Sequence, residues 1–370
     1  MNPRYDTVLR FAYLLLCFIF IACFSQPRVP RQSPSSDSAV IDDLDGISNA
    51  ALKNPALDGQ SAEKSFDIWK ENPEDFYAIV GELPRPGDPV TVIFLPAKDN
   101  NRKLEASLVS GSGKRLGGAP FFDWVLDDEG HSVKACVFSV PSTFDGTEAV
   151  VRIEGADIFE IRLKERKFVA EEIPLNPSNT ALRTVPDPRK TAESERLWAI
   201  ISRSGGTVYA TGPFTPPVAA DTRRTSFFGD RRVYRYSNGK SDTAVHAGID
   251  YGVPTGTPVS ACAAGRVVLA GERIVTGNSV IIEHLPGVYS IYYHLDRIFA
   301  EEGAVVKEGD LIGLSGSTGL ATGPHLHWEL RAASENTDPD VLCARPILDG
   351  AAAKKIIKER GEQIYAELSR

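Results

Sequence analysis

Short apolar runs separated by turn signals occupy the chain from about residue 75 to residue 165. The runs are rich in valine, isoleucine, leucine and phenylalanine, which is typical of β-strands. They are PVTVIFLP, LEASLV, SVKACVFSV, EAVVRI and IFEIRL, and the turns include KDNN, GSGK, DDEG and FDGT. This rhythm predicts a small β-sandwich domain over residues 66–165. It contains one histidine, His131, and no cluster of reactive side chains, which favours a structural or spacing role.

The next segment, residues 166–211, is expected to connect this domain to a second one and to contain a helix. Asp187 can cap a helix, Pro188 suits the first helical turn, and the glycines at 205 and 206 suit its end. Leucine and isoleucine between these signals form one apolar stripe. We therefore expect a connector helix that packs on a neighbouring element through that stripe.

A second β-rich region follows over residues 212–345, with strand candidates TPVSACAAGRVVLAG, SVIIEHL, VYSIYYHL and HLHWELR between glycine turns. The tail, residues 346–370, has the pattern of a helix with a weak apolar stripe, interrupted by Gly361. The predicted fold class is therefore mainly β: an N-terminal β-sandwich and a C-terminal β-sheet domain of barrel-sandwich type, with a connector helix and a C-terminal helix.

The first residues, 1–23, have the features of an export signal. Arg4 and Arg10 precede the apolar run FAYLLLCFIFIACF. This run is too short to cross a bilayer comfortably and fits a secretory signal. The sequence FIAC, which ends at Cys23, resembles a bacterial lipobox. A lipid anchor at Cys23, a cleaved soluble signal and a retained anchor all remain open, and each predicts export. Residues 24–65 are rich in proline, serine and aspartate and predict a flexible linker.

Composition narrows the function classes. Hydrophobic residues make up 42% of the chain and charged residues 24%, as in ordinary globular proteins, and the net charge is −8. An acidic chain without a basic run argues against a nucleic-acid partner. Three cysteines in the two predicted domains, Cys136, Cys262 and Cys343, do not make a disulfide framework. They are expected as buried thiols, and a bridge between Cys262 and Cys343 is left open.

Histidine is concentrated in the second domain, where five of the six lie. HAGID places His246 four residues before Asp250, YYHLD contains His294, and HLH contains His325 and His327. Two residues that alternate along a strand share one face, so both HLH imidazoles point the same way. A catalytic zinc needs about three nitrogen or oxygen ligands, an open position and a nearby base. These motifs could supply all of them, although spacing alone does not decide which HLH histidine is the ligand.

The motifs FGDRR, HAGIDYGVPTGTPVSACAAGRVV, GNSVIIEH, YYHLD, VVKEGDLIGLSGSTG and TGPHLHWEL occur in this order. Together they resemble the lysostaphin/LytM-type zinc metallopeptidases, peptidase family M23, over about residues 225–332. The resemblance implies that residues 212–345 form a metallopeptidase domain with one zinc ion. Two departures, EHLPG and ENTDPD in place of the family's usual segments, put only the rim of the groove in doubt.

The resemblance also implies a role for each motif residue. His246, Asp250 and His327 would bind zinc. His294 and His325 would orient and deprotonate the attacking water and then stabilise the tetrahedral intermediate.

The activity implied by the resemblance is hydrolysis of peptide bonds in peptidoglycan, at cross-links or stem peptides, in the bacterial cell envelope. The alternative is a zinc-binding but autoinhibited or silent protein that regulates other cell-wall hydrolases, with a regulatory protein partner. Filled ligand positions favour the enzyme. His284, in IIEHLPG, matches no catalytic position and is expected to be a strand-end surface or packing residue.

Overall fold

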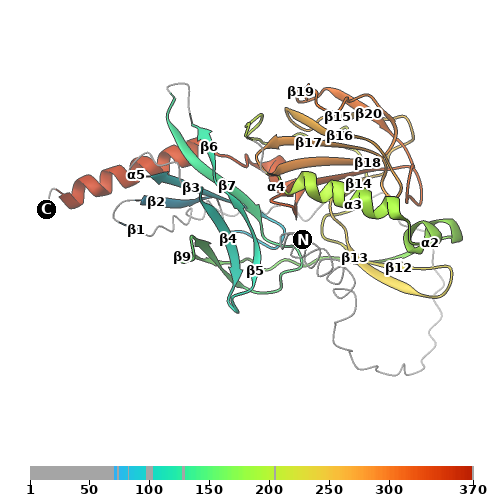
Figure 1. The fold of residues 1–370 in the computed structure, drawn as a ribbon, viewed down its shortest axis with the longest axis horizontal. Coiled ribbons are helices and arrows are strands. Elements are labelled where there is room, and N and C mark those ends of the chain that lie inside the picture. The colour runs from blue at the N-terminus through green and yellow to red at the C-terminus, as the bar shows by residue number, and fades with distance from the viewer. Residues whose placement is uncertain are drawn as a thin grey trace, which may run out of the picture. The chain divides into compact units, whose positions relative to one another are not determined.

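The structure, a computed structural model, describes residues 71–72, 75–81, 83–96, 103–126, 130–203 and 206–368. The predicted export signal, the lipid anchor at Cys23 and the linker therefore lie outside the described residues. Within them, no helix is long and apolar enough to cross a membrane. The chain is mainly β (Figure 1), which confirms the predicted fold class.

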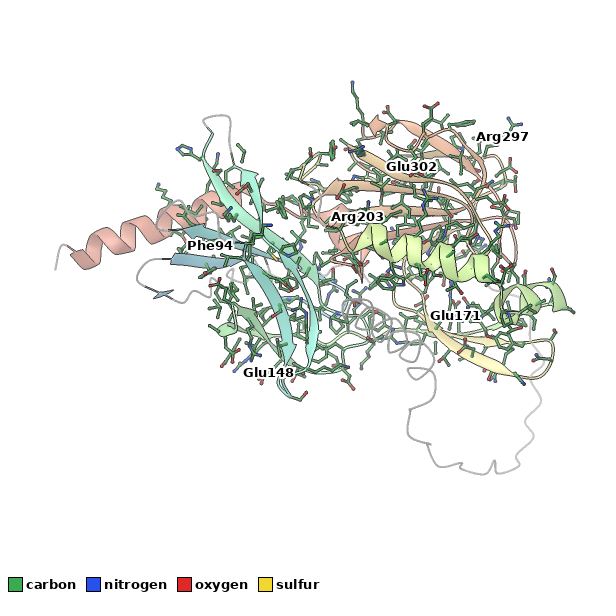
Figure 2. All side chains as sticks on the ribbon, viewed as in Figure 1. Phe94, Glu148, Glu171, Arg203, Arg297 and Glu302 are labelled. Carbon is green, nitrogen blue, oxygen red and sulfur yellow. The ribbon has the colours of Figure 1, made fainter. Side chains whose placement is uncertain are left out.

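Two antiparallel sheets form the N-terminal β-sandwich. One has the strand order β1-β2-β3-β7-β6 and the other has the order β5-β4-β8-β9. The strands are β1 Glu71–Asn72, β2 Asp75–Val80, β3 Pro89–Pro96, β4 Glu105–Ser110, β5 Arg115–Pro120, β6 Phe122–Val125, β7 Ser132–Ser139, β8 Glu148–Ile153 and β9 Ala156–Arg162. Alternate apolar side chains from both sheets, Phe94 among them (Figure 2), pack into one buried cluster. Each predicted run is a strand here, and β1, β2, β5 and β6 are additional.

A ten-stranded sheet forms the second β region. Its main path is β11-β14-β21-β18-β17-β16-β19, with β15, β20 and β22 paired off this path. The strands are β11 Arg224–Ser226, β14 Ile249–Tyr251, β15 Pro258–Ser260, β16 Gly265–Arg273, β17 Gly277–Leu285, β18 Val288–Ile298, β19 Val305–Val306, β20 Leu311–Ser315, β21 Leu326–Ala332 and β22 Glu335–Thr337. The central strands β17, β18 and β21 are buried on both faces; β17 and β18 contain the apolar runs VII and IYY, whereas β21, LHWELRA, alternates apolar and polar residues.

A third, three-stranded sheet contains β10 Ala170–Pro174, β12 Arg231–Arg235 and β13 Ser241–Val245. The hairpin β12–β13 is antiparallel, whereas β10 joins β12 in parallel. Strand β10 comes from the segment that was expected to be only a connector. The structure thus adds part of this segment, as a strand, to a hairpin that leads directly into His246.

The predicted connector helix is confirmed as α3, Pro188–Ile201. The Asp187 side chain accepts a hydrogen bond from the Arg189 amide, as expected of a helix cap. Its apolar residues Ile200 and Ile201 pack against the sheet that contains β16, β17 and β18, and Figure 1 shows the helix lying along this sheet. The predicted C-terminal helix is α5, Gly350–Leu368. Two shorter helices, α2 Pro177–Thr184 and α4 Pro339–Ala344, are additional.

The β-sandwich and the ten-stranded sheet contact each other through the chain that follows β22. Thr91 of β3 donates to the carbonyl of Ile347 at 2.7 Å, and Ser139 of β7 hydrogen-bonds Thr337. Arg166 forms ion pairs with Asp88 and Asp338. Apolar residues of β2, β3, β6 and β7 share a buried cluster with residues of α4 and α5. The sandwich is therefore packed against the second β region.

The three described cysteines are free thiols. Cys136 and Cys262 are buried and Cys343 is partly exposed, so the bridge left open between Cys262 and Cys343 is not present. Burial raises the pKa of Cys136 to about 12 and that of Cys262 to about 11. Both therefore behave as small apolar residues, as expected.

Candidate metal centre and groove

Strand pairing brings two of the motifs together. Strands β14 and β21 are antiparallel neighbours, and the register places Asp250 directly opposite His327. His246 lies just before β14, where its amide donates to the carbonyl of Asp230 at 2.8 Å. Gly248, between His246 and Asp250, lies so close to β21 that an added Cβ would be 2.0 Å from the carbonyl oxygen of Trp328. The spacing H-x-G-x-D is therefore required by the close approach of the two backbones.

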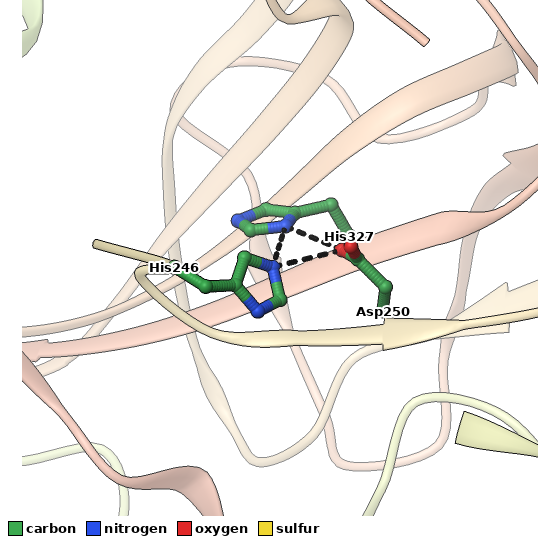
Figure 3. Close-up of side chains that lie close together, drawn as sticks. All are labelled: His246, Asp250 and His327. Carbon is green, nitrogen blue, oxygen red and sulfur yellow. Dashed lines mark hydrogen bonds and ion pairs between the residues drawn. The ribbon is translucent and has the colours of Figure 1, made fainter. Parts of the chain in front are cut away.

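Three side-chain atoms converge at this point (Figure 3): Nε2 of His246, Oδ1 of Asp250 and Nδ1 of His327. The two nitrogens are 3.0 Å apart, and Oδ1 lies 3.1 Å from His246 Nε2 and 2.7 Å from His327 Nδ1. Neighbouring ligands of a tetrahedral zinc ion, each bonded at about 2.0–2.2 Å, lie about 3.3–3.6 Å apart. The donor types fit such an ion, and the triangle that they form fits it after the donors move apart by less than about 1 Å.

Hydrogen bonds on the far side of each ring fix the direction of the lone pairs. Nδ1 of His246 faces the carbonyl oxygen of Phe227 at 2.8 Å. Because a carbonyl can only accept, Nδ1 carries the hydrogen and Nε2 has the lone pair that can bind a metal. Nε2 of His327 faces the Glu329 carboxylate at 3.0 Å, so Nδ1 is its inward atom. Ligands held in this way are typical of metal sites in proteins.

A β-bulge directs His294 toward the same site. The pairing of β17 with β18 shifts register between Asn278 and Val280, and His294 has a positive φ of 63°, which is unusual for a non-glycine residue. The His294 Nδ1–H donates to the carbonyl oxygen of Thr318 at 2.8 Å, so Nε2 is unprotonated. Tyr293 stacks its ring on His327, with centroids 5.5 Å apart.

His325 completes the group of predicted residues. Its Nδ1–H donates to the carbonyl oxygen of Gly323 at 2.8 Å, and its Nε2 lies 3.9 Å from Oδ1 of Asp250. The rings of His325 and His294 are 4.7 Å apart between centroids. The structure therefore brings all five predicted site residues together, with the three proposed ligands at the centre and the other two histidines beside them.

Electrostatics hold the ligands in different charge states. Although burial opposes it, the His327 and His246 imidazoles hold the pKa of Asp250 well below its usual value. Burial would lower the pKa of His327, but the Asp250 and Glu329 carboxylates raise it to about 9. A metal ion that binds here would displace the proton at Nδ1. Burial lowers the pKa of His294 to about 3, so this ring is neutral.

Four neighbours of the centre were not predicted. Glu329 receives His327 Nε2–H and is itself paired with Arg331 at 2.8 Å. Arg232 donates to Asp250 Oδ2 at 2.6 Å and to Glu171 Oε1 at 2.6 Å. Glu329 and Arg331 continue the alternation of the HLH motif, so strand periodicity could have identified both. Arg232 ends the FGDRR motif of the resemblance, which gave it no role, and nothing in the sequence links Glu171 to Asp250, because the two lie on separate strands.

His284 lies outside this group. Of the two expected roles, strand-end surface residue and packing residue, it has the second. It is fully buried, with its Nδ1–H donating to Ala264 O at 2.8 Å and its Nε2 2.8 Å from Ser290 Oγ.

A cavity of about 540 Å³ opens beside the centre. One wall comes from β10, β12 and β13, with Ile173, Leu175 and Tyr234 among its residues. The opposite wall comes from the loop before His325. Helix α2 links the two walls, because Asn179 donates to the carbonyl of Ala321 at 3.0 Å and Ser237 N donates to Thr180 Oγ1. The segment before the family match therefore helps to build the walls of a cavity that opens onto the centre.

The model of peptidase family M23 matches residues 244–339, so this segment is similar to the M23 metallopeptidases. It includes all five predicted site residues.

The DD-carboxypeptidase/endopeptidase Mpg of Neisseria meningitidis serogroup B is 37% identical over 167 residues, which cover 44% of this chain and 38% of the relative. The peptidoglycan DD-endopeptidase ShyA of Vibrio cholerae is 40% identical over 114 residues, covering 31% of this chain and 26% of the relative. Among solved structures, the catalytic domain of lysostaphin from Staphylococcus simulans is 30% identical with a TM-score of 0.30, covering 34% of this chain and 94% of that one. The matched part thus spans well under half of either curated relative.

Proposed function

We propose that this chain is a zinc-dependent endopeptidase of the bacterial cell envelope that hydrolyses peptide bonds in peptidoglycan. The observation that carries the proposal is the convergence of His246, Asp250 and His327 beside two further histidines that line the same cavity. Two relatives are named for DD-endopeptidase activity, which favours cross-links between D-amino acids as the bond cut.

The proposed roles follow from which histidine ring nitrogens are held by a hydrogen bond and which are free to act. Zinc held by His246 Nε2, Asp250 Oδ1 and His327 Nδ1 would polarise the amide carbonyl and lower the pKa of water toward 7. His294 and His325 each have Nδ1–H bound to a backbone carbonyl, so both rings present Nε2 to the groove. One Nε2 accepts the proton of the attacking water, and the resulting imidazolium stabilises the oxyanion and returns a proton to the leaving amine.

Direct attack by water needs no covalent intermediate with the protein. The water oxygen bonds to the carbonyl carbon, the C–N bond breaks, and the two water protons end on the amine and, after ionisation, in solvent. The protein contributes fixed geometry: Gly323 and Thr318 carbonyls prevent rotation of the two free histidines.

The test uses the full chain, stripped of metal by a chelator and then reloaded with one equivalent of zinc. Peptidoglycan with direct cross-links is digested, and the released peptides are identified by mass spectrometry. We expect cross-linked dimers to disappear only in the reloaded sample. The variant His294→Ala should bind zinc but cut about 10²–10⁴-fold more slowly. His131→Ala, an exposed histidine of the sandwich, is the matched control and should cut normally.

Zinc binding without cleavage of any cross-linked or stem peptide would support the regulatory alternative instead. That outcome would not bear on the predictions of export and of a lipid anchor. Absence of zinc binding would reject both.

A further inference from the structure

Strand β10 lies well before the matched segment, yet it reaches the metal centre through its partner strand. It pairs in parallel with β12 over five consecutive positions, from Ala170 opposite Arg231 to Pro174 opposite Arg235. Alternate residues of paired strands point to opposite faces. Glu171 therefore shares a face with Arg232, and Glu172 extends to the other face, where it meets Arg235.

A continuous chain of charged contacts runs from β10 to the metal ligand. Glu171 Oε1 accepts from Arg232 Nε at 2.6 Å, and Arg232 Nη2 donates to Asp250 Oδ2 at 2.6 Å. Ser226 donates to the same Glu171 oxygen at 2.8 Å and pairs through its backbone with Asp250. Glu171, labelled in Figure 2, is thus fixed from two sides.

The guanidinium fixes which oxygen of Asp250 is left for the metal. Arg232 occupies Oδ2, so Oδ1 alone faces His246 and His327. The planar guanidinium donates in two set directions, which lets one residue bridge two carboxylates. Both Arg232 and Asp250 are largely buried, where an uncompensated charge is costly. Glu171 supplies the second negative charge that holds Arg232 beside the site of a cation.

We propose that Glu171 and Arg232 are positioning residues: Glu171, from the segment before the peptidase domain, acts through Arg232 to hold Asp250 in the orientation that binds the metal. This inference rests on the metal site proposed above. It makes β10 part of the functional unit, although that strand lies outside the residues that match the family.

The chain provides its own matched control. Glu172 and Arg235 form an ion pair on the same two strands, one residue after Glu171 and three residues after Arg232, and both side chains are more than half exposed. Glu171→Gln and Glu172→Gln each remove one carboxylate from β10 without changing its length or shape. Only the first contacts the chain of residues that leads to Asp250.

The experiment measures the zinc affinity of the metal-free full chain by competition with a chromophoric chelator. Glu171→Gln should weaken zinc binding by about 10- to 100-fold, as expected for loss of a group that orients a ligand. Glu172→Gln should bind as the unsubstituted chain does. The thermal unfolding of each metal-free variant is recorded alongside, because a merely structural role would lower the unfolding temperature and leave zinc affinity unchanged. Equal zinc affinity of Glu171→Gln and the unsubstituted chain overturns the proposal.

A second variant tests the route. If Glu171 acts through Arg232, adding Glu171→Gln to Arg232→Gln should cause no further loss of zinc affinity. Additive losses would show that Glu171 acts directly and would overturn the proposed route. Arg232→Gln also stands in for Glu171→Gln if the latter does not fold: it should itself bind zinc more weakly, and unchanged or tighter binding overturns the proposal. If the unsubstituted chain binds no zinc, the proposed function fails instead.

Discussion

Acidification should destabilise the folded chain through His284, a residue outside the groove. Its ring is fully buried, and burial lowers its pKa to about 4. Nδ1–H is committed to Ala264 O, and Nε2 faces Ser290 Oγ and, at 3.6 Å, Cys262 Sγ. The Phe214 ring lies 4.9 Å away. Protonation would therefore create a buried charge whose neighbours, Ala264 O, Ser290 Oγ and Cys262 Sγ, are all neutral.

The sign and size of the effect follow from the two pKa values. The unfolded chain gains a proton at His284 near pH 6.5, whereas the folded chain resists it until about pH 4. Between these values the unfolded state binds more protons, so the free energy of unfolding falls as the pH falls. The full difference corresponds to about 3 kcal/mol, present above pH 6.5 and lost by about pH 4.

Other groups titrate in the same range, so the assay compares variants. Urea unfolding of the metal-free chain is followed by tryptophan fluorescence from pH 7.5 to pH 4.5. His284→Gln keeps a donor and an acceptor but does not titrate, and its stability should fall less with pH than that of the unsubstituted chain. Ser290→Ala keeps the histidine and should retain the steep dependence. Parallel loss of stability in the His284→Gln variant and the unsubstituted chain would refute this reasoning.

Three further predictions concern the site itself. Gly248→Ala should abolish zinc binding, because its Cβ would lie 2.0 Å from Trp328 O, whereas Gly271→Ala, with open space around it, should bind zinc normally in the same chelator assay. His325→Ala should retain zinc, measured by metal analysis, and lose about 10²–10⁴-fold in peptidoglycan cleavage; normal cleavage would remove it from the mechanism. Tyr293→Phe keeps the ring stacked on His327 and should preserve zinc affinity, whereas Tyr293→Ala should lower zinc affinity. Equal zinc affinities of these two variants would show that stacking does not orient His327.

The sequence predicted the strands of the sandwich and the connector helix because each depends on local signals. PVTVIFLP and EAVVRI became β3 and β8 over the same residues, and Asp187 and Pro188 mark the start of α3. Strands β5 and β6 were missed because RLGGAP is interrupted by two glycines and FDWV is only 4 residues long. Their pairing to β4 and β7 determines their conformation, which local propensity does not report.

The ligand set illustrates what spacing can and cannot decide. Alternation correctly put His325 and His327 on one face, but it treats the two rings as equivalent. The structure distinguishes them because His327 lies opposite Asp250 in a regular ladder, and His325 lies at an isolated bridge with Gly316. The position of His294 could not be predicted from alternation at all, since a bulge with a positive φ sets its direction.

The connector region has consequences for how the groove obtains its selectivity. The five histidine and aspartate positions of the centre lie within residues 244–339, but the wall formed by Ile173, Leu175 and Tyr234 lies outside that range. If the proposed function holds, the residues for bond cleavage and those for peptide recognition are encoded in separate stretches of sequence. Because Glu171 of β10 contacts Arg232, this wall of the cavity is linked to the proposed metal ligand Asp250. We therefore expect substitutions of Glu171 to alter metal affinity and substrate preference together, whereas substitutions of Thr322, which also lines the cavity, should alter preference alone.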